Sequence, residues 1–585
     1  MPLLLSSLHI LITWLALALT LLGLGSLLLS FFARNFLLTD AIWVGLGVAV
    51  AVLQVWSLLL PINLSVVALL FGLGILGLIA NGPYLAPQLS GELKQSKVRS
   101  LIYVAIVFFI ALRCVGSCDY YDTGLYGMPA VRWAQAYPVV PGLVNLHGRL
   151  GFNSSVFLSV AALSQGIWKN LGFHLFAGLL LSLMWLTVLP ATSHILGRRS
   201  ESSADRFNFI LAIPLAFFSV RSPIVGTLTD EPATILCLVG AGILFALLRS
   251  EAPHAESQVK TDRVITVTVL FALAVTVKLS VAVFAGIAWL VAVASFFRAG
   301  DNPSKARAAL AWASFLTTCI LVPWCVRGVI LTGYPFYPAP VFAFPVDWKS
   351  PLAMTQYVAG AVHAWGKIPD VPASQIVGYS WLTGWIHRLI RNRSGFQAPA
   401  FISIFALAIV ALRRIQSRPT GLPQYLWLLL PSCVGIAFWF VASPDLRFAQ
   451  FAIWTAAATL GAWAIEIAGS ASSGNRWYWP AALWVGLLAW CLFSFGWWAN
   501  LTRVLDSPPL SPAPVANVVA RPTRSGLLVN VPVSGNQCWD APIPCTPYFD
   551  DTLRLRRDSS LRSGFQSNCV INFYDQMNGD AVTSR

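Results

Sequence analysis

The sequence predicts an all-α polytopic membrane protein, and three observations support this fold class. Hydrophobic residues make up 57% of the 585 residues and charged residues only 10%, whereas soluble domains carry about 25% charged residues. Apolar runs of about 20 residues recur along the chain, which is the length that crosses a bilayer as a helix. Basic residues gather in short clusters between these runs, as in loops that set membrane topology. This distribution excludes nucleic acid as the reason for the net charge of +15.

Long apolar runs must be helices in a membrane, because lipid cannot satisfy polar groups of the backbone. We expect about fourteen membrane helices, two of which, 208–220 and 264–277, are short for a full span. The predicted spans are 8–32, 41–60, 63–80, 100–115, 171–190, 208–220, 232–248, 264–277, 279–297, 309–326, 398–412, 424–442, 448–468 and 480–498.

The orientation follows from the positions of the basic residues. Loops that contain clusters such as Lys94, Lys97 and Arg99 are expected in the cytoplasm, because positive loops remain inside. The chain is then an integral, multi-pass protein of the cell membrane. Its N-terminus, its C-terminal tail and three loops lie on the exterior face; these loops are 116–170, 221–231 and 327–397.

The chain divides into three predicted regions. Residues 1–99 form an N-terminal preamble of three membrane helices, without residues suited to chemistry. Residues 100–498 form the main transmembrane region and carry the long exterior loops. Residues 499–585 form a small exterior segment, which begins with a Pro-rich linker.

Several local structures are expected outside the membrane. Pro129–Ala136 begins with proline and is rich in helix formers, which predicts a short helix. Asn153–Trp168 predicts a second, amphipathic helix at the membrane interface, and 526–534 predicts a strand. Cys538 and Cys545 lie seven residues apart in the exterior tail, where a disulfide can form. Their spacing leaves open whether they pair.

Asp119 and Asp122 open the first long exterior loop, immediately after an apolar run. If the loop starts as a helix, residues three apart share a face. A carboxylate in this position is able to accept the proton of an attacking hydroxyl, so both are candidate catalytic residues and Asp122 is the leading general base. The alternative is that Asp122 caps the next helix and Asp119 is a solvated loop charge.

Asp230 and Glu231 stand together in the second exterior loop. Their oxygens suit Mg²⁺ or Mn²⁺, so one of them is a candidate metal ligand together with Asp119 or Asp122. The alternative is that both are acids at a helix N-terminus, where the helix dipole favours negative charge.

Lys278, Arg327 and Arg447 each lie where an apolar run meets an exterior loop. Cations on this side oppose the rule that sets topology, so they need another role. Binding the phosphate of a lipid carrier is one such role, because arginine holds phosphate oxygens in a bidentate fork. The alternatives are contact with lipid head groups or, for Arg447, an ion pair with Asp445.

His147 and Arg149 lie among glycines in the first exterior loop, in Asn145-Leu-His-Gly-Arg-Leu-Gly151. Both are candidates for substrate contact. The alternative for His147 is a purely structural role, which is the commoner fate of a single histidine.

Four segments together resemble the GT-C superfamily of membrane glycosyltransferases, and especially its bacterial members. They are Asp122-Thr-Gly-Leu-Tyr126, the pair Asp230-Glu231, Lys278, and the region from Pro323-Trp324 through Arg327 to Gly333-Tyr-Pro-Phe-Tyr-Pro338. The resemblance covers roughly 100–450, and the run Cys538-Trp-Asp-Ala-Pro-Ile-Pro-Cys545 supports it in the tail.

This resemblance implies an inverting, single-displacement transfer from a polyprenyl-phosphate sugar to a glycan, lipid or protein acceptor. Asp122 is then the base, sometimes with a divalent cation, and Tyr126 and Tyr337 of the matching motifs join the substrate-binding set. Thr123 stands where the family motif usually has a second acid, which leaves Asp119 as the substitute partner.

Three other functions remain open for this sequence. A polymerase or ligase that joins lipid-linked glycans would rely more on arginines than on a base. A flippase or transporter needs polar residues in the middle of its spans, whereas the charges here cluster at the outer ends. A noncatalytic GT-C-like subunit is the third.

Overall fold

The computed structural model describes residues 2–32, 36–196, 203–249, 257–298, 303–416, 422–469, 510–557 and 560–568. In these ranges the chain is mostly helical and has very little sheet. The helices are α1 Pro2–Leu29, α2 Leu38–Leu59, α3 Leu64–Gln95, α4 Lys97–Cys114, α5 Met128–Ala136, α6 Ser155–Leu163, α7 Phe176–Leu196, α8 Ser203–Arg221, α9 Asp230–Leu248, α10 Ser257–Val277, α11 Ala282–Arg298, α12 Pro303–Thr332, α13 Leu352–Lys367, α14 Trp381–Arg391, α15 Ala398–Gln416, α16 Leu429–Ala442 and α17 Gln450–Gly469. The strands are β1 Val518–Pro522, β2 Leu528–Pro532, β3 Arg554–Leu555 and β4 Phe565–Gln566.

The helices agree with the predicted apolar runs. Each run from 8–32 to 448–468 falls on a helix, and the last run, 480–498, lies outside the described residues. In the described part of the chain, nine helical segments are long and apolar enough to cross a membrane. The remaining predicted spans fall on α4, α8, α10 and α11, which are shorter or carry more charge, so the count of fourteen stays a prediction.

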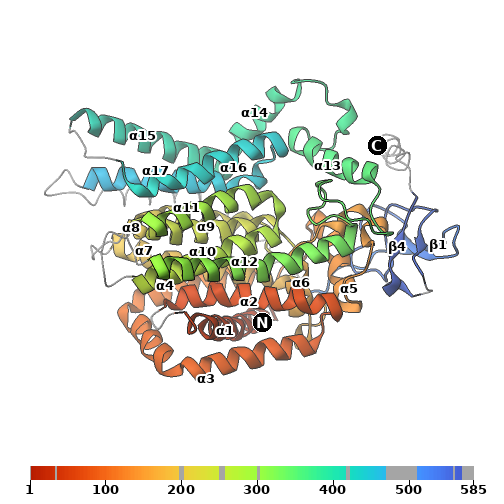
Figure 1. The fold of residues 1–585 in the computed structure, drawn as a ribbon, viewed down its shortest axis with the longest axis horizontal. Helices are drawn as coiled ribbons and strands as arrows, with labels where there is room; N and C mark the ends of the chain where they lie inside the picture. The colour runs from red at the N-terminus through yellow and green to blue at the C-terminus, as the bar shows by residue number, and fades with distance from the viewer. Residues whose placement is uncertain are drawn as a thin grey trace.

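The helices lie roughly side by side in three layers (Figure 1). The first layer is α1 to α3, in which α1 packs against both of its neighbours. The middle layer is α7 to α12, and α2 joins it to the first layer through contacts with α10 and α12. The third layer is α15 to α17, where α17 packs on α8 and α9.

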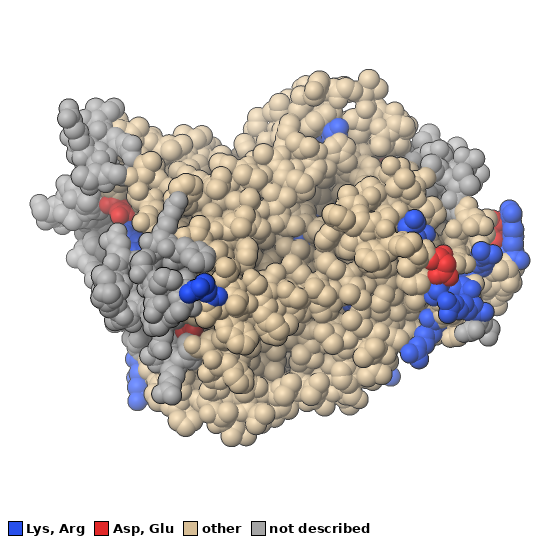
Figure 2. All heavy atoms as spheres, viewed as in Figure 1, with Lys and Arg blue, Asp and Glu red and all other residues tan. Residues whose placement is uncertain are grey.

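The surface has the properties of a protein that crosses a bilayer. On the face shown in Figure 2, most charged side chains lie near the two ends and the belt between them is uncharged. Large apolar side chains point outward from helices of the outer layers, for example Leu15, Ile79, Phe401 and Val441, which are 62%, 71%, 63% and 73% exposed. Soluble monomers rarely expose apolar surface on this scale. The protein is therefore a multi-pass helical membrane protein.

The two ends of the bundle differ in what they carry. At one end lie α5, α6, α13 and the C-terminal strands (Figure 1). The opposite end holds the helix termini that lead into the shorter connections, such as the end of α9 near Arg249. The 19 residues of α9 separate the ends by about 28 Å at a rise of about 1.5 Å per residue.

The first long loop contains the predicted short helix, α5, but the prediction for its second helix was wrong. The α-helical part is only Ser155–Leu163, its residues from Ser155 to Ala162 are all buried, and Gly166–Trp168 forms a separate 3-10 turn. The reason is that α6 packs among α2, α5 and α7 instead of lying at the membrane interface. Its start is fixed by Ser154, whose hydroxyl donates a hydrogen bond to the Val277 carbonyl at 2.8 Å.

The C-terminal segment is a small, mainly irregular unit with two short antiparallel sheets, β1 with β2 and β3 with β4. Strand β2 confirms the strand expected at 526–534, and Cys538 and Cys545 form a disulfide. Phe565 and Val529 share a hydrophobic cluster with Trp133 of α5. The segment therefore packs directly on the first long loop.

Candidate functional site

Asp122 lies at the start of a helical turn that leads into α5. Residues Thr123–Gly127 are π-helical, a rare geometry that often occurs at functional sites. The Asp122 side chain makes no capping hydrogen bond, so its carboxylate is not used to stabilise the helix end. Asp119 precedes the helical turn and is exposed. The expectation that the two acids share a helix face was therefore wrong.

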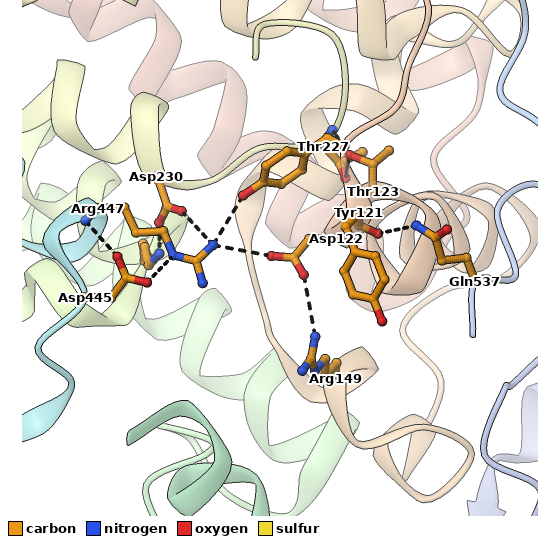
Figure 3. Close-up of polar contacts among 11 residues, drawn as sticks. Tyr121, Asp122, Thr123, Arg149, Thr227, Asp230, Asp445, Arg447 and Gln537 are labelled. Atoms are coloured by element: carbon orange, nitrogen blue, oxygen red, sulfur yellow. Dashed lines mark hydrogen bonds and ion pairs between the residues drawn. The ribbon is translucent and has the colours of Figure 1, made fainter. Parts of the chain in front are cut away.

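The Asp122 carboxylate lies between two arginines that come from distant parts of the chain (Figure 3). Nη1 of Arg149, in the same loop, is 3.5 Å from Oδ1. Nη1 of Arg447, in the turn before α17, is 3.9 Å from Oδ2. The Asp122 side chain is 26% exposed, so its carboxylate keeps some access from outside the protein.

Arg447 is the centre of a wider ionic network. Its Nη1 is also 3.9 Å from Oδ2 of Asp230, and its Nε is 3.2 Å from Oδ2 of Asp445. This contact confirms the predicted pair with Asp445. The Tyr120 hydroxyl accepts a hydrogen bond from Nη1 at 3.4 Å. Burial works to lower the pKa of Arg447, but Asp445, Tyr120 and Asp122 hold it above its ordinary value.

Lys278 forms an ion pair with Asp230, the carboxylate that Arg447 also approaches. Its Nζ also lies 3.9 Å from the centre of the Phe448 ring. Asp230 and Glu231 occupy the first turn of α9, as the dipole interpretation expects. In the described residues no group of three or more His, Cys, Asp or Glu residues gathers in a way that could hold a metal ion. Asp230 pairs with Lys278 and Arg447 here, and the Mg²⁺ or Mn²⁺ site stays a prediction.

On its other side, Arg149 faces aromatic groups. Its guanidinium lies 5.9 Å from the ring centre of Tyr126, and the ring of His147 packs against Tyr548 at 4.9 Å. His147 and Tyr337 are 3% and 6% exposed. In the described residues, neither Nε2 of His147 nor the Tyr337 hydroxyl has a hydrogen-bond partner.

His147 is neutral at ordinary pH. Burial, with the Arg149 charge nearby, lowers the pKa of His147 to about 3. A neutral imidazole and a phenol are both able to bond to hydroxyl groups. The Arg149 side of Asp122 thus combines aromatic surface with polar groups that retain bonding capacity.

Thr123 connects the loop before α5 to the loop before α9. Its hydroxyl is buried and accepts a hydrogen bond from the backbone N–H of Thr227 at 3.1 Å. Gly127 allows this close approach, because a Cβ there would lie 1.8 Å from the Thr227 hydroxyl. The motif of the GT-C glycosyltransferases usually has an acid at this position. Here Thr123 occupies it and joins two loops.

The C-terminal segment also contacts the Asp122 turn. The backbone N–H of Trp539 donates to the Gly124 carbonyl at 2.8 Å, and a Cβ on Gly124 would lie 2.3 Å from the Trp539 ring. Gln537 donates to the Tyr121 carbonyl at 2.8 Å, and Asp540 pairs with Arg132 of α5. The loop 538–545, which is closed by a disulfide, thus braces the helical turn that carries Asp122.

Arg327 does not belong to this network. It lies in α12 and its Nη1 donates to the side-chain oxygen of Asn153 at 2.9 Å. It lines a cavity formed mainly by α5, the following loop and the end of α12. The structure therefore brings Lys278 and Arg447 together and places Arg327 elsewhere.

A family model described as a domain of unknown function, DUF8201, matches residues 8–454. The chain belongs to the DUF8201 family. No curated protein and no solved structure matches the chain. The DUF8201 match contains all the charged residues around Asp122, whereas Trp539 and the rest of the loop 538–545 lie beyond it. The bracing of the Asp122 turn is thus an addition to the DUF8201 region.

Sequence reasoning missed Tyr120, Trp539 and Asp540 in this DUF8201 protein. Tyr120 is adjacent to the acidic motif, which is a signal that could have included it. Trp539 and Asp540 lie within the Cys538–Cys545 run, but nothing in their local sequence indicates a contact with residues 124 and 132.

Proposed function

We propose that the protein is a membrane glycosyltransferase that transfers a sugar from a polyprenyl-phosphate donor to a hydroxyl acceptor on the exterior face, with inversion. The observation that carries this proposal is the position of Asp122, a partly exposed carboxylate between Arg447 and Arg149. The side of Asp122 next to Arg447 suits the leaving phosphate, and the side next to Arg149 suits the acceptor.

Lys278 and Arg447 would hold the donor phosphate. Both are next to Asp230, and substrate phosphate would compete with this carboxylate for them. Arginine and lysine near a developing phosphate charge stabilise a transition state electrostatically. We assign the donor side of the site to these two residues and not to Arg327.

The acceptor would bind beside Arg149, Tyr126, His147 and Tyr337. Its hydroxyl oxygen attacks the anomeric carbon of the donor sugar, and Asp122 takes the hydroxyl proton. The bond between the anomeric carbon and the phosphate oxygen breaks, and the electron pair leaves with the polyprenyl phosphate. The products are a glycoside and a lipid phosphate, and no step is assigned to a metal ion.

The test compares wild type with Asp122→Asn and Asp119→Asn, each purified in detergent. The assay measures sugar release or transfer from a panel of labelled polyprenyl-phosphate sugars, with Mg²⁺ or with a chelator. We expect turnover to be lost in Asp122→Asn while donor binding persists. Asp119→Asn removes the same charge three residues away and should retain turnover, because Asp119 takes no part in the network.

Arg447→Gln gives a second, different signature. The loss of a phosphate ligand should weaken donor binding as well as turnover. Full turnover in an Asp122→Asn protein of normal abundance would contradict the proposal. Lipid binding by wild type without turnover of any donor would favour the flippase or the noncatalytic subunit.

A further inference from the structure

Arg113 is partly buried and Arg327 is buried, and neither has an acid partner in the described residues. Their guanidinium groups differ in how many hydrogen bonds they make. Arg113, near the end of α4, donates to the carbonyls of Ser219 and Ser222 at 2.6 and 2.8 Å. These carbonyls lie at the C-terminus of α8, where the helix dipole favours a cation. The fold thus supplies Arg113 with negative charge density.

Arg327 lacks such compensation. It is 7% exposed, and the single side-chain contact of its guanidinium in the described residues is the one with Asn153. Its Nε has no hydrogen-bond partner there. A guanidinium stays charged in proteins, and a buried charge without a counter-charge is strongly destabilising.

The cavity beside Arg327 offers a place for the missing charge. Trp133 lines the same cavity, and its Nε1 is also buried without a partner in the described residues. The other walls are largely aromatic and aliphatic, including Tyr137, Phe152, Phe157 and Leu331. One cation and one neutral N–H donor, each with an atom that has no partner in the described residues, therefore line the same mainly apolar space.

The size of the cavity limits what it can hold. Its volume is about 30 Å³, and a single water needs about 10 to 15 Å³ on this measure. This volume accepts about two water-sized groups. Because both partnerless groups are donors, the ligand must be an acceptor, and the charge on Arg327 selects an anion.

We propose that Arg327 and Trp133 form a binding site for a small monovalent anion of the chloride class, beneath the first long loop. The anion would neutralise Arg327 and join α12 to α5, because the two donors come from these helices. The site is independent of the proposed transferase activity, and its test needs no substrate.

The test measures thermal unfolding of the full-length protein in detergent, with sodium chloride or sodium bromide replacing sodium gluconate at constant ionic strength. A ligand that binds only the folded state raises the unfolding midpoint with its concentration. We expect the midpoint of wild type to rise by a few degrees and to saturate with either halide. Arg327→Gln should remove this rise.

Arg113→Gln is the matched control. It removes a guanidinium of the same kind from a place where carbonyls already compensate it, so the halide response should persist whatever happens to stability. Trp133→Phe keeps the ring packing but removes the N–H, and should raise the halide concentration needed for half of the effect several-fold. This variant also provides the test if Arg327→Gln does not fold.

Two outcomes would overturn the proposal. An equal midpoint in halide and in gluconate would mean that the cavity holds only water. An undiminished halide response in both Arg327→Gln and Trp133→Phe would place the anion elsewhere.

Discussion

Each end of the helical bundle has a carboxylate that faces two arginines, but at different distances. At the end opposite α5 and the C-terminal strands, Glu466 of α17 lies 2.5 Å from Arg249 and accepts a hydrogen bond from the Tyr425 hydroxyl at 2.7 Å. Arg206 is 3.7 Å away. At the other end, the arginines lie 3.5 and 3.9 Å from Asp122.

Burial does not account for the difference, because the side chains of Glu466 and Asp122 are 30% and 26% exposed. The difference lies in the bonds. Glu466 makes contacts of direct hydrogen-bond length, whereas those of Asp122 exceed the usual N–H···O distance of about 2.9 Å. A carboxylate with satisfied oxygens stabilises a helix packing, and one whose partners stand back keeps its oxygens available for other hydrogen bonds.

The largest expected effect is the difference in transfer activity between variants of the two carboxylates. Asp122→Asn should reduce transfer by about 10² to 10⁴, which is the usual contribution of a general base. Glu466→Gln should leave the rate per folded molecule within about twofold, because a group at the far end acts on no substrate. The measurement is turnover normalised to folded protein from size-exclusion chromatography. A comparable loss in both variants would remove the functional distinction between the two clusters.

The same two variants should differ in stability in the opposite order, with the larger loss in Glu466→Gln. Glu466→Gln leaves Arg249 without its counter-charge and should lower the free energy of unfolding by about 1 to 3 kcal/mol. Asp122→Asn should lower it by less than about 1 kcal/mol, because its ion pairs are long and partly solvated. Thermal unfolding of both proteins in one detergent checks this order. A larger destabilisation by Asp122→Asn would show that the Asp122 cluster is structural.

His147 provides a pH-dependent test of the cluster around Asp122. Its pKa is about 3 in the folded protein against 6.5 when solvated, so between these values the unfolded state binds a proton that the folded state does not. Stability should therefore fall as the pH falls, by up to about 1.4 kcal/mol per pH unit from this group. The unfolding midpoint between pH 7 and pH 4 measures the slope.

The slope should become shallower in His147→Asn. His194 is the matched control: its Nδ1 lies 3.3 Å from Asp205 at the opposite end, so His194→Asn should leave the His147 contribution in place. An unchanged slope in His147→Asn would mean that this imidazole is not held in a neutral, buried state.

The smallest expected effect concerns the connection between the loop before α5 and the loop before α9. Thr123→Val removes the acceptor of the Thr227 N–H and should cost about 1 kcal/mol of stability. Thr123→Ser keeps the hydroxyl and should cost less. Unfolding midpoints of the two variants decide the matter, and equal values would show that the hydroxyl does not hold the loops together.

Much of the helical architecture was predictable from the sequence, because the physics that sets it is local. A bilayer-length apolar run must be a helix, so the predicted runs in the described residues fall on helices. The helix at 155–163 shows the limit of this reasoning. Its polar residues suggested an interfacial helix, but Ser154 and its neighbours bond to other helices, which periodicity does not reveal.

The charged cluster was predictable only in part. Asp122, Lys278 and Arg447 could be selected because charges at the ends of apolar runs are costly and need a reason. That Arg327 stands apart from them was not visible, because its place depends on how α12 packs against α5. Trp539 could not be assigned at all, because its role arises from a contact between segments that lie far apart in the sequence. The neighbouring contact between Tyr121 and Gln537 spans 416 positions.

The docking of Trp539 on Gly124 has a consequence for the order of assembly in the cell. The residues around Asp122 emerge from the ribosome long before the loop 538–545 that braces them, so the membrane helices can insert while the turn still lacks its support. The brace is complete only after residues 538–545 have been made and Cys538 has joined Cys545. A truncated chain that ends after α17 would lack this brace, because Trp539 lies beyond that point.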